Sequence, residues 1–150
     1  MKTFPGLLAL AIALLATPAH AQVKLGDKTT VAFATVDEGR EVLGKRDDFV
    51  ERMSPFDRAA RLKTDRAVSE QEYLAFARKN VFAWDDAEKR AMTEALDGIA
   101  GKIAALGLPL PERVLLVKTT GNEEGRAYYT RARAIVFPEE KLHAPAEGIQ

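Results

Sequence analysis

The chain has 150 residues, with 22 basic and 22 acidic side chains, two histidines and no cysteine. A net charge of zero excludes a strong field that would gather nucleic acid or anionic lipid, so neither is an expected partner. The lack of cysteine excludes disulfides and thiolate chemistry, so the fold must be stabilised by packing.

The N-terminal segment has the three parts of a secretory signal peptide. Lys2 is the positive start, residues 7–16 (LLALAIALLA) are an unbroken apolar run, and Ala19 and Ala21 are small residues at the two positions that a signal peptidase reads. The apolar run is shorter than the roughly 20 residues that span a bilayer. We therefore predict cleavage between Ala21 and Gln22, no stable membrane span afterwards, and a bacterial periplasmic or secreted protein.

Residues 22–150 contain no repeat or low-complexity linker, which predicts a single domain. Residues 29–35 (TTVAFAT) favour a short strand or an extended entry. From Val36 to Met53 the apolar residues recur at the spacing of one helix with one buried stripe.

Three helix starts follow. Residues 54–57 (SPFD) combine a capping serine with a proline at the first helical position, and residues 69–72 (SEQE) form a capping box. Residues 85–88 (DDAE) begin the most regular helix, whose apolar stripe starts at Met92 and which ends at Gly107.

The character of the sequence changes after this helix. Residues 113–120 (RVLLVKTT) favour a strand, residues 121–125 (GNEEG) favour a turn, and residues 126–137 (RAYYTRARAIVF) can return as a second strand. The predicted fold class is therefore α+β, with a helical N-terminal two-thirds followed by a β-hairpin.

Alternation along the returning strand places Tyr129, Arg131 and Arg133 on one face, together with Ile135 and Phe137. This basic, aromatic edge is a possible binding surface for an extended peptide, a protein or an anion. The other interpretation is that the charges protect an edge strand from aggregation, which is common in sheets. We favour the protective role.

No complete catalytic or metal-binding set is found. Glu140 and His143 have a spacing that recurs at metal sites, but a single pair lacks the further ligands that zinc or iron needs. Four neighbouring carboxylate pairs point to different sides, and nothing in their spacing tunes a pKa. These pairs are Asp47/Asp48, Asp85/Asp86, Glu123/Glu124 and Glu139/Glu140. We therefore assign no catalytic, cofactor-binding or metal-binding residue.

Residues 106–142 (LGLPLPERVLLVKTTGNEEGRAYYTRARAIVFPEEKL) resemble the segment just upstream of the zinc-binding helix in secreted bacterial metallopeptidase-like proteins of the zincin type. Residues 33–65 resemble the helical lead of such proteins. The resemblance implies that residues 132–138 form the edge of the active-site sheet. It also implies that the next helix carries His-Glu-x-x-His, whose histidines hold zinc while the glutamate acts as base.

The chain departs from this pattern where the chemistry would begin. It contains no His-Glu-x-x-His, and residues 144–150 (APAEGIQ) stand where that helix would start. Zinc is thus implied only by the resemblance, and we expect a partial version without catalytic activity. One face of residues 132–137, either Ile135 and Phe137 or Ala134 and Val136, should then lack full burial.

Two other hypotheses stay open. The chain is a complete, non-catalytic periplasmic binding or interaction module that uses the charged hairpin, or it is an enzyme complete within these residues. The partner is unknown in either case.

Overall fold

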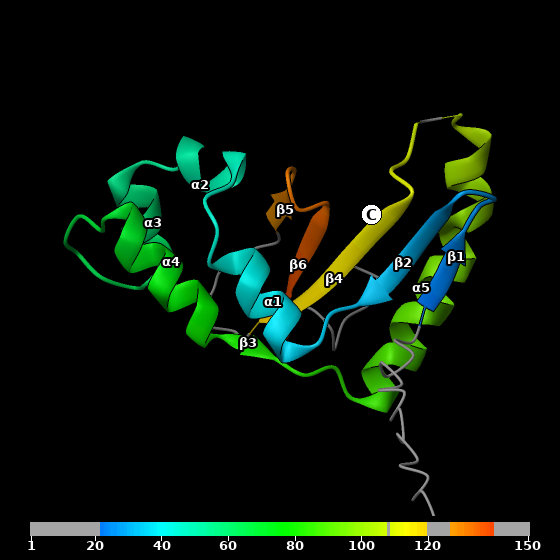
Figure 1. Cartoon of the computed structure of the whole chain (residues 1–150), viewed down its shortest axis with the longest axis horizontal. Coiled ribbons are helices and arrows are strands. Elements are labelled where there is room, and N and C mark those ends of the chain that lie inside the picture. The colour runs from blue at the N-terminus through cyan, green and yellow to red at the C-terminus, as the bar shows by residue number, and fades with distance from the viewer. Residues whose placement is uncertain (1–21, 108, 120–126, 140–150) are drawn as a thin grey trace, which may run out of the picture.

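The computed structural model describes residues 22–107, 109–119 and 127–139, and a six-stranded mixed sheet lies at the centre of them (Figure 1). Strands occur before, between and after the helices along the chain. In chain order they are β1 (Gln22–Leu25), β2 (Thr29–Phe33), α1 (Val36–Leu43), α2 (Asp48–Arg52), α3 (Pro55–Arg61), α4 (Glu70–Lys79), β3 (Val81–Phe82), α5 (Asp86–Ala105), β4 (Arg113–Thr119), β5 (Ala127–Tyr129) and β6 (Ala134–Pro138).

The strand order is β1-β2-β4-β6-β5, and β3 pairs with the carboxyl end of β4. Three central strands, β2, β4 and β6, run parallel, with Val31 opposite Val114 and Leu116 opposite Ile135. The outer strands β1 and β5 run antiparallel to their neighbours. Because parallel strands carry apolar side chains on both faces, both faces of this sheet need a covering layer.

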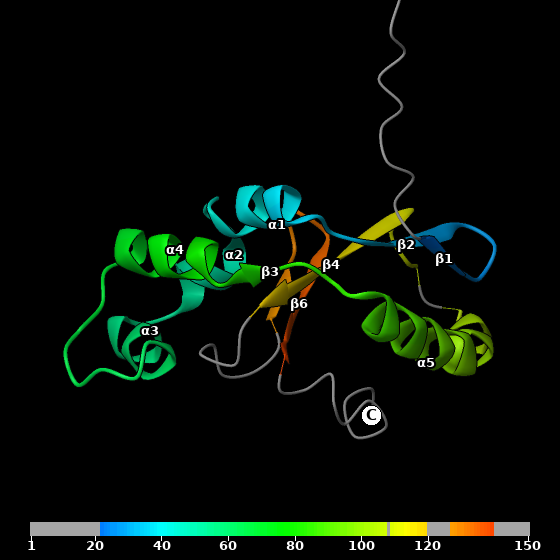
Figure 2. The ribbon, with the colours of Figure 1, turned by 90° about the horizontal axis from the view of Figure 1, so that it is seen from below.

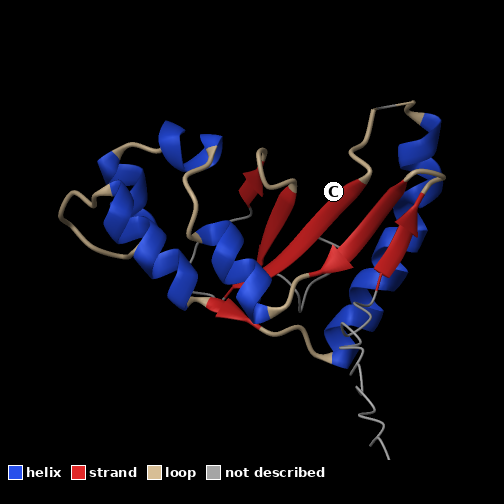
Figure 3. Ribbon diagram, viewed as in Figure 1, coloured by secondary structure: helices blue, strands red, loops and turns tan. Residues whose placement is uncertain are grey.

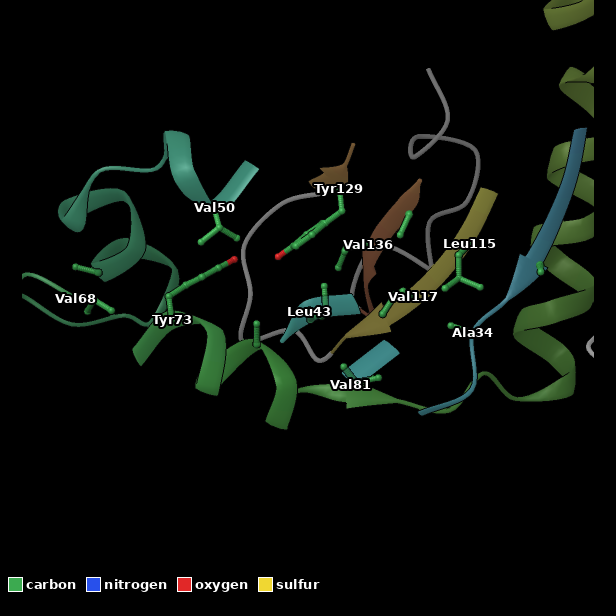
Figure 4. Close-up of a cluster of buried hydrophobic side chains, with 14 residues drawn as sticks. Ala34, Leu43, Val50, Val68, Tyr73, Val81, Leu115, Val117, Tyr129 and Val136 are labelled. Carbon is green, nitrogen blue, oxygen red and sulfur yellow. The ribbon is translucent and has the colours of Figure 1, made fainter. Parts of the chain in front are cut away.

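Helices cover the two faces unequally. The α1 and α4 helices lie on one side of the sheet and α5 lies on the other, as the two views at right angles show (Figures 2 and 3). The larger core fills the α1–α4 side, where Tyr73 of α4 and Tyr129 of β5 point toward one another (Figure 4). Other fully buried side chains of this core are Leu43, Val50, Val68, Val117 and Val136.

Trp84 organises the smaller core on the α5 side. Its indole Nε1–H donates a hydrogen bond of 3.0 Å to the backbone oxygen of Leu116, so the one polar atom of the ring is satisfied. The ring packs edge-on against Phe33, with 5.1 Å between centroids. Met92 is the most deeply buried residue of α5 and belongs to this core.

The predicted order of a helical two-thirds followed by a β-hairpin is wrong. Two strands precede the first helix, β3 lies between helices, and β4 and β6 are parallel rather than a hairpin. The single strand predicted over residues 126–137 is interrupted by a turn at Thr130–Arg133, where Arg133 has a φ of 52°. The Asp47 carboxylate accepts the N–H groups of Thr130 and Arg131. Because the residue that stabilises this turn is distant in sequence, the local sequence does not indicate the turn.

The helix predicted from Val36 to Met53 is in fact two helices. Gly44 ends α1, and the Asp47 side chain caps α2 by accepting the N–H of Phe49. A Cβ at position 44 would lie 2.9 Å from the backbone oxygen of Arg40 and would also meet the Arg78 side chain of α4, so glycine is favoured there.

The other local predictions agree with the structure. Residues 29–33 form a strand, and Ser54, Ser69 and Asp85 each cap a helix. Gly107 has a φ of 61° after α5. One detail differs: the Glu72 carboxylate pairs with Arg66 rather than with the backbone of Ser69.

Among the helices that the structure describes, none combines the length and the apolar character needed to cross a bilayer.

Candidate functional site: an apolar cleft between α5 and the sheet

A cleft of about 320 Å³ lies between α5 and the sheet, and we call it the α5 cleft. Its lining is almost entirely apolar and comes from α5, from the central strands and from the segments at the two ends of α5. The lining residues are Leu25, Thr29, Val31, Met92, Leu96, Ile99, Ile103, Leu110, Pro111, Val114, Leu116, Ile135 and Phe137.

The cleft exists because one helix is too narrow for this face. A helix with its side chains is about 10 Å across and neighbouring strands are about 4.8 Å apart, so one helix covers roughly two strands. The α5 helix packs on the β1 and β2 side of the sheet. The apolar stripe of α5 is only partly buried. Met92 is buried, whereas Leu96, Ile99 and Ile103 are partly exposed.

Strands β1, β2, β4 and β6 all contribute side chains to the cleft, and β6 differs in burial between its two faces. Ala134 and Val136, which face the α1–α4 side, are fully buried. Ile135 and Phe137, which face the α5 side, are only partly buried although they lie on a parallel strand next to the middle of the sheet. Of the two pairs predicted from the sequence, Ile135 and Phe137 are therefore the ones that lack a full cover.

Charged residues lie just beyond one end of the cleft lining. Lys118 lies in β4 two residues after Leu116, Glu139 directly follows β6, and Glu88 lies in α5 one turn before Met92. The Lys118 Nζ donates a hydrogen bond of 2.5 Å to Glu88 Oε1 and lies 3.6 Å from Glu139 Oε1. The Lys118 and Glu88 side chains are 7% and 9% exposed, whereas that of Glu139 is 46% exposed. We call these three residues the charged end.

The two carboxylate oxygens of Glu88 accept hydrogen bonds from different partners, Lys118 and the backbone of Asp85. Glu88 Oε2 accepts the backbone N–H of Asp85 at 2.8 Å, which completes the capping box of α5. In return the Glu88 N–H donates to the Asp85 carboxylate, and this hydrogen bond holds the pKa of Asp85 below its ordinary value. The helix start and the charged end are therefore one connected network.

A second cleft, of about 420 Å³, lies between α1 and the turn that precedes β6. Three cations line it, and each has an acidic partner: Lys45 with Glu41, Arg46 with Glu70, and Arg131 with Asp48. Because these charges neutralise one another, this cleft is a weaker candidate for a binding site than the α5 cleft.

The predicted edge surface is not one continuous strand face. Tyr129 is fully buried in the larger core, and its ring lies 5.5 Å from that of Phe49. Arg131 lies in the turn and pairs with Asp48 and Glu51. Arg133 is exposed at the end of the turn. The expected edge position of residues 132–138 is also wrong, because β5 lies outside β6 among the described strands.

Several other candidate residues lie outside the described residues: Ala21, Glu123, Glu124, Glu140 and His143. Gln22, on the other side of the predicted cleavage point, begins β1. Among the side chains that the structure describes, no three His, Cys, Asp or Glu residues are grouped as a metal ion would require.

The sequence interpretation missed Lys118 and Glu88 as a pair. The sequence places Lys118 in a predicted strand and Glu88 at a predicted helix start, and neither position indicates the other. A lysine within an otherwise apolar strand is a usable signal, because a buried ammonium needs a carboxylate partner. Which carboxylate it meets depends on how α5 packs.

Comparison of the chain with protein families, curated proteins and solved structures finds no match.

Proposed function

We propose that this chain is the sheet-forming part of an exported metallopeptidase-like domain of the zincin type. In this proposal the described residues provide the scaffold and the α5 cleft, and no catalytic group is assigned to them. The support comes from the resemblance of residues 106–142 and from the position of the cleft beside β6, the strand after which zincin-type proteins have their zinc-binding helix.

The observation that carries the proposal is the unequal burial of β6. A parallel strand inside a sheet is normally covered on both faces. Here Ala134 and Val136 are fully buried, whereas Ile135 and Phe137 are only partly buried and α5 lies off to the side of them. One further helix beside α5 would cover the strand.

Export is part of the same proposal. The apolar run at residues 7–16 and the small residues Ala19 and Ala21 support a cleaved signal peptide. The protein then acts in the periplasm or outside the cell, where its lack of cysteine is tolerated.

The test is to read the gene past codon 150 and to measure zinc in the purified products. We expect a His-Glu-x-x-His within the next few helical turns. A product that includes it should hold tightly bound zinc, whereas residues 22–150 alone should neither hold zinc nor cleave peptides. A stop codon after Gln150, with no such motif in close relatives, would contradict the proposal. Tightly bound zinc in residues 22–150 alone would contradict it as well.

A second candidate is a non-catalytic binding module that accepts an amphipathic helix from a partner. Exposed apolar side chains after α5 favour it: Leu106, which caps the end of α5, is 67% exposed, and Leu110, which lines the cleft, is 39% exposed. This candidate requires residues 22–150 to be monodisperse and to melt cooperatively. Aggregation of that product would contradict it.

A further inference from the structure

The first strand starts at the residue that follows the predicted cleavage point. β1 begins at Gln22, and its register pairs Gln22 with Ala32 of β2. Val23 and Leu25 are buried in the smaller core, so the apolar face of β1 anchors it to the rest of the fold. The end of β1 that carries Gln22 therefore has a defined place beside β2.

The Gln22 side chain itself is exposed. It alternates with the buried residues of β1 and shares the open face of the strand with Lys24. The Lys24 ammonium is directed toward β2, where it donates a hydrogen bond of 2.9 Å to Thr30 Oγ1. β1 is also the outermost strand on its side of the described sheet. The Gln22 carboxamide is thus able to turn back toward its own backbone nitrogen.

Cleavage before Gln22 would place a free α-amine and a carboxamide in the same residue. An α-amine titrates close to neutral pH, so part of it is the uncharged nucleophile there. Its nitrogen is linked to the side-chain Cδ through Cα, Cβ and Cγ, so their reaction closes a five-membered ring. Because both groups belong to one residue, the attack needs no encounter between molecules.

We infer that Gln22 is a modification site and that the mature chain begins with pyroglutamate. The inference rests on the export part of the proposed function, since it needs the cleavage after Ala21. The α-amine nitrogen attacks Cδ of Gln22, and the new N–Cδ bond closes the lactam. The Cδ–Nε2 bond breaks, and ammonia leaves with the proton that the amine gives up. No oxidant, reductant or cofactor takes part.

The modification protects a short strand. The lactam removes the positive charge of a free N-terminus and keeps one N–H that can still donate a hydrogen bond. It also removes the primary amine that an aminopeptidase would bind. β1 has four residues, so trimming Gln22 and Val23 would remove half of it and one side chain of the smaller core.

The experiment expresses the complete chain, including residues 1–21, in a bacterium and purifies the exported product. A protease that cleaves after aspartate and glutamate releases residues 22–27, because Asp27 is the first acidic residue after Ala21. Tandem mass spectrometry reads this peptide before and after incubation of the folded product at neutral pH. We expect the loss of one ammonia, located at residue 22, in essentially all of the peptide after incubation.

Gln22→Glu is the matched control. It keeps the length of the side chain, but its carboxylate is negatively charged at neutral pH and resists attack by the amine. We expect the N-terminal peptide of this variant to keep an open residue 22 over the same incubation. Equal ring closure in the parent protein and in Gln22→Glu would overturn the inference, because the carboxamide would then not be the reacting group.

The outcomes distinguish the inference from the proposed export. A product that begins at residue 22 and keeps an open glutamine after incubation overturns the inference and leaves export standing. Ring closure that occurs in urea but not in buffer also overturns it, because the pairing of β1 would then prevent the reaction in the folded protein. A product that retains residues 1–21, or that begins at another residue, contradicts both the proposed cleavage and the modification.

Discussion

Asp47 is the residue that ties the two halves of the chain together. It is 2% exposed, and its carboxylate accepts the N–H of Phe49 at 3.4 Å and the N–H groups of Thr130 and Arg131 at 3.0 Å each. One side chain therefore caps α2 and holds the turn that leads into β6. The position of β6 depends on that turn.

Replacing Asp47 with alanine should lower the free energy of unfolding by about 1–3 kcal/mol, because buried N–H groups lose a charged acceptor. The matched control is Asp48→Ala, which removes the ion pair with the half-exposed Arg131 and one acidic side chain from the first turn of α2, and should cost about 0–1 kcal/mol. Urea unfolding of both variants checks this. Equal losses for the two variants would mean that Asp47 has no special role.

Residue patterns could predict that Asp47 and Asp48 point to different sides, but not what each of them contacts. Both N–H donors from the turn are more than 80 positions away in sequence. The same limit applies to Lys118 and Glu88, which are 30 positions apart and belong to different elements. Local spacing says which side chains share a face, whereas partners across the fold depend on packing.

At the scale of elements, Gly39 lets α1 pack closely against the sheet. A Cβ at position 39 would lie 2.7 Å from Val81 Cγ1 and 3.0 Å from Val117 Cγ1. The glycine therefore lets α1 approach β3 and β4 more closely than any other residue would allow.

Gly39→Ala should destabilise the protein by about 1–3 kcal/mol, since the added methyl group overfills a packed contact. Gly98→Ala is the matched control: it lies on α5, has nothing within 4 Å of the added Cβ, and should be neutral or stabilise by up to about 1 kcal/mol. Thermal unfolding of the two variants measures both. A stabilised Gly39→Ala would show that α1 packs differently from this description.

Element boundaries were predicted well where a cap marks them, as at Ser54, Ser69 and Asp85. The order and direction of the strands were not. Nothing local distinguishes an antiparallel return from the parallel pairing of β4 with β6, because the same apolar alternation serves both. The four-residue strand β1 was missed because its polar surroundings resemble a loop.

At the scale of the whole molecule, the two faces of the sheet differ in burial at β6. Ala134 and Val136 are fully buried on the α1–α4 side, whereas Ile135 and Phe137 line a cleft on the α5 side. This asymmetry supports both candidate functions, since each of them places a further helix on the same strand. The resemblance implied that one face of residues 132–137 would lack full burial, and in the structure Ile135 and Phe137 are the less buried pair.

The most direct test compares two neighbouring positions on β6 by thiol reactivity. The chain has no cysteine, so Ile135→Cys and Val136→Cys each introduce a single thiol, and a disulfide reagent reports its accessibility under native conditions. The cysteine at position 135 should react much faster than the one at position 136, which becomes accessible only by local unfolding. Equal protection of both thiols, in variants that melt like the parent protein, would contradict the partly covered sheet on which this account depends.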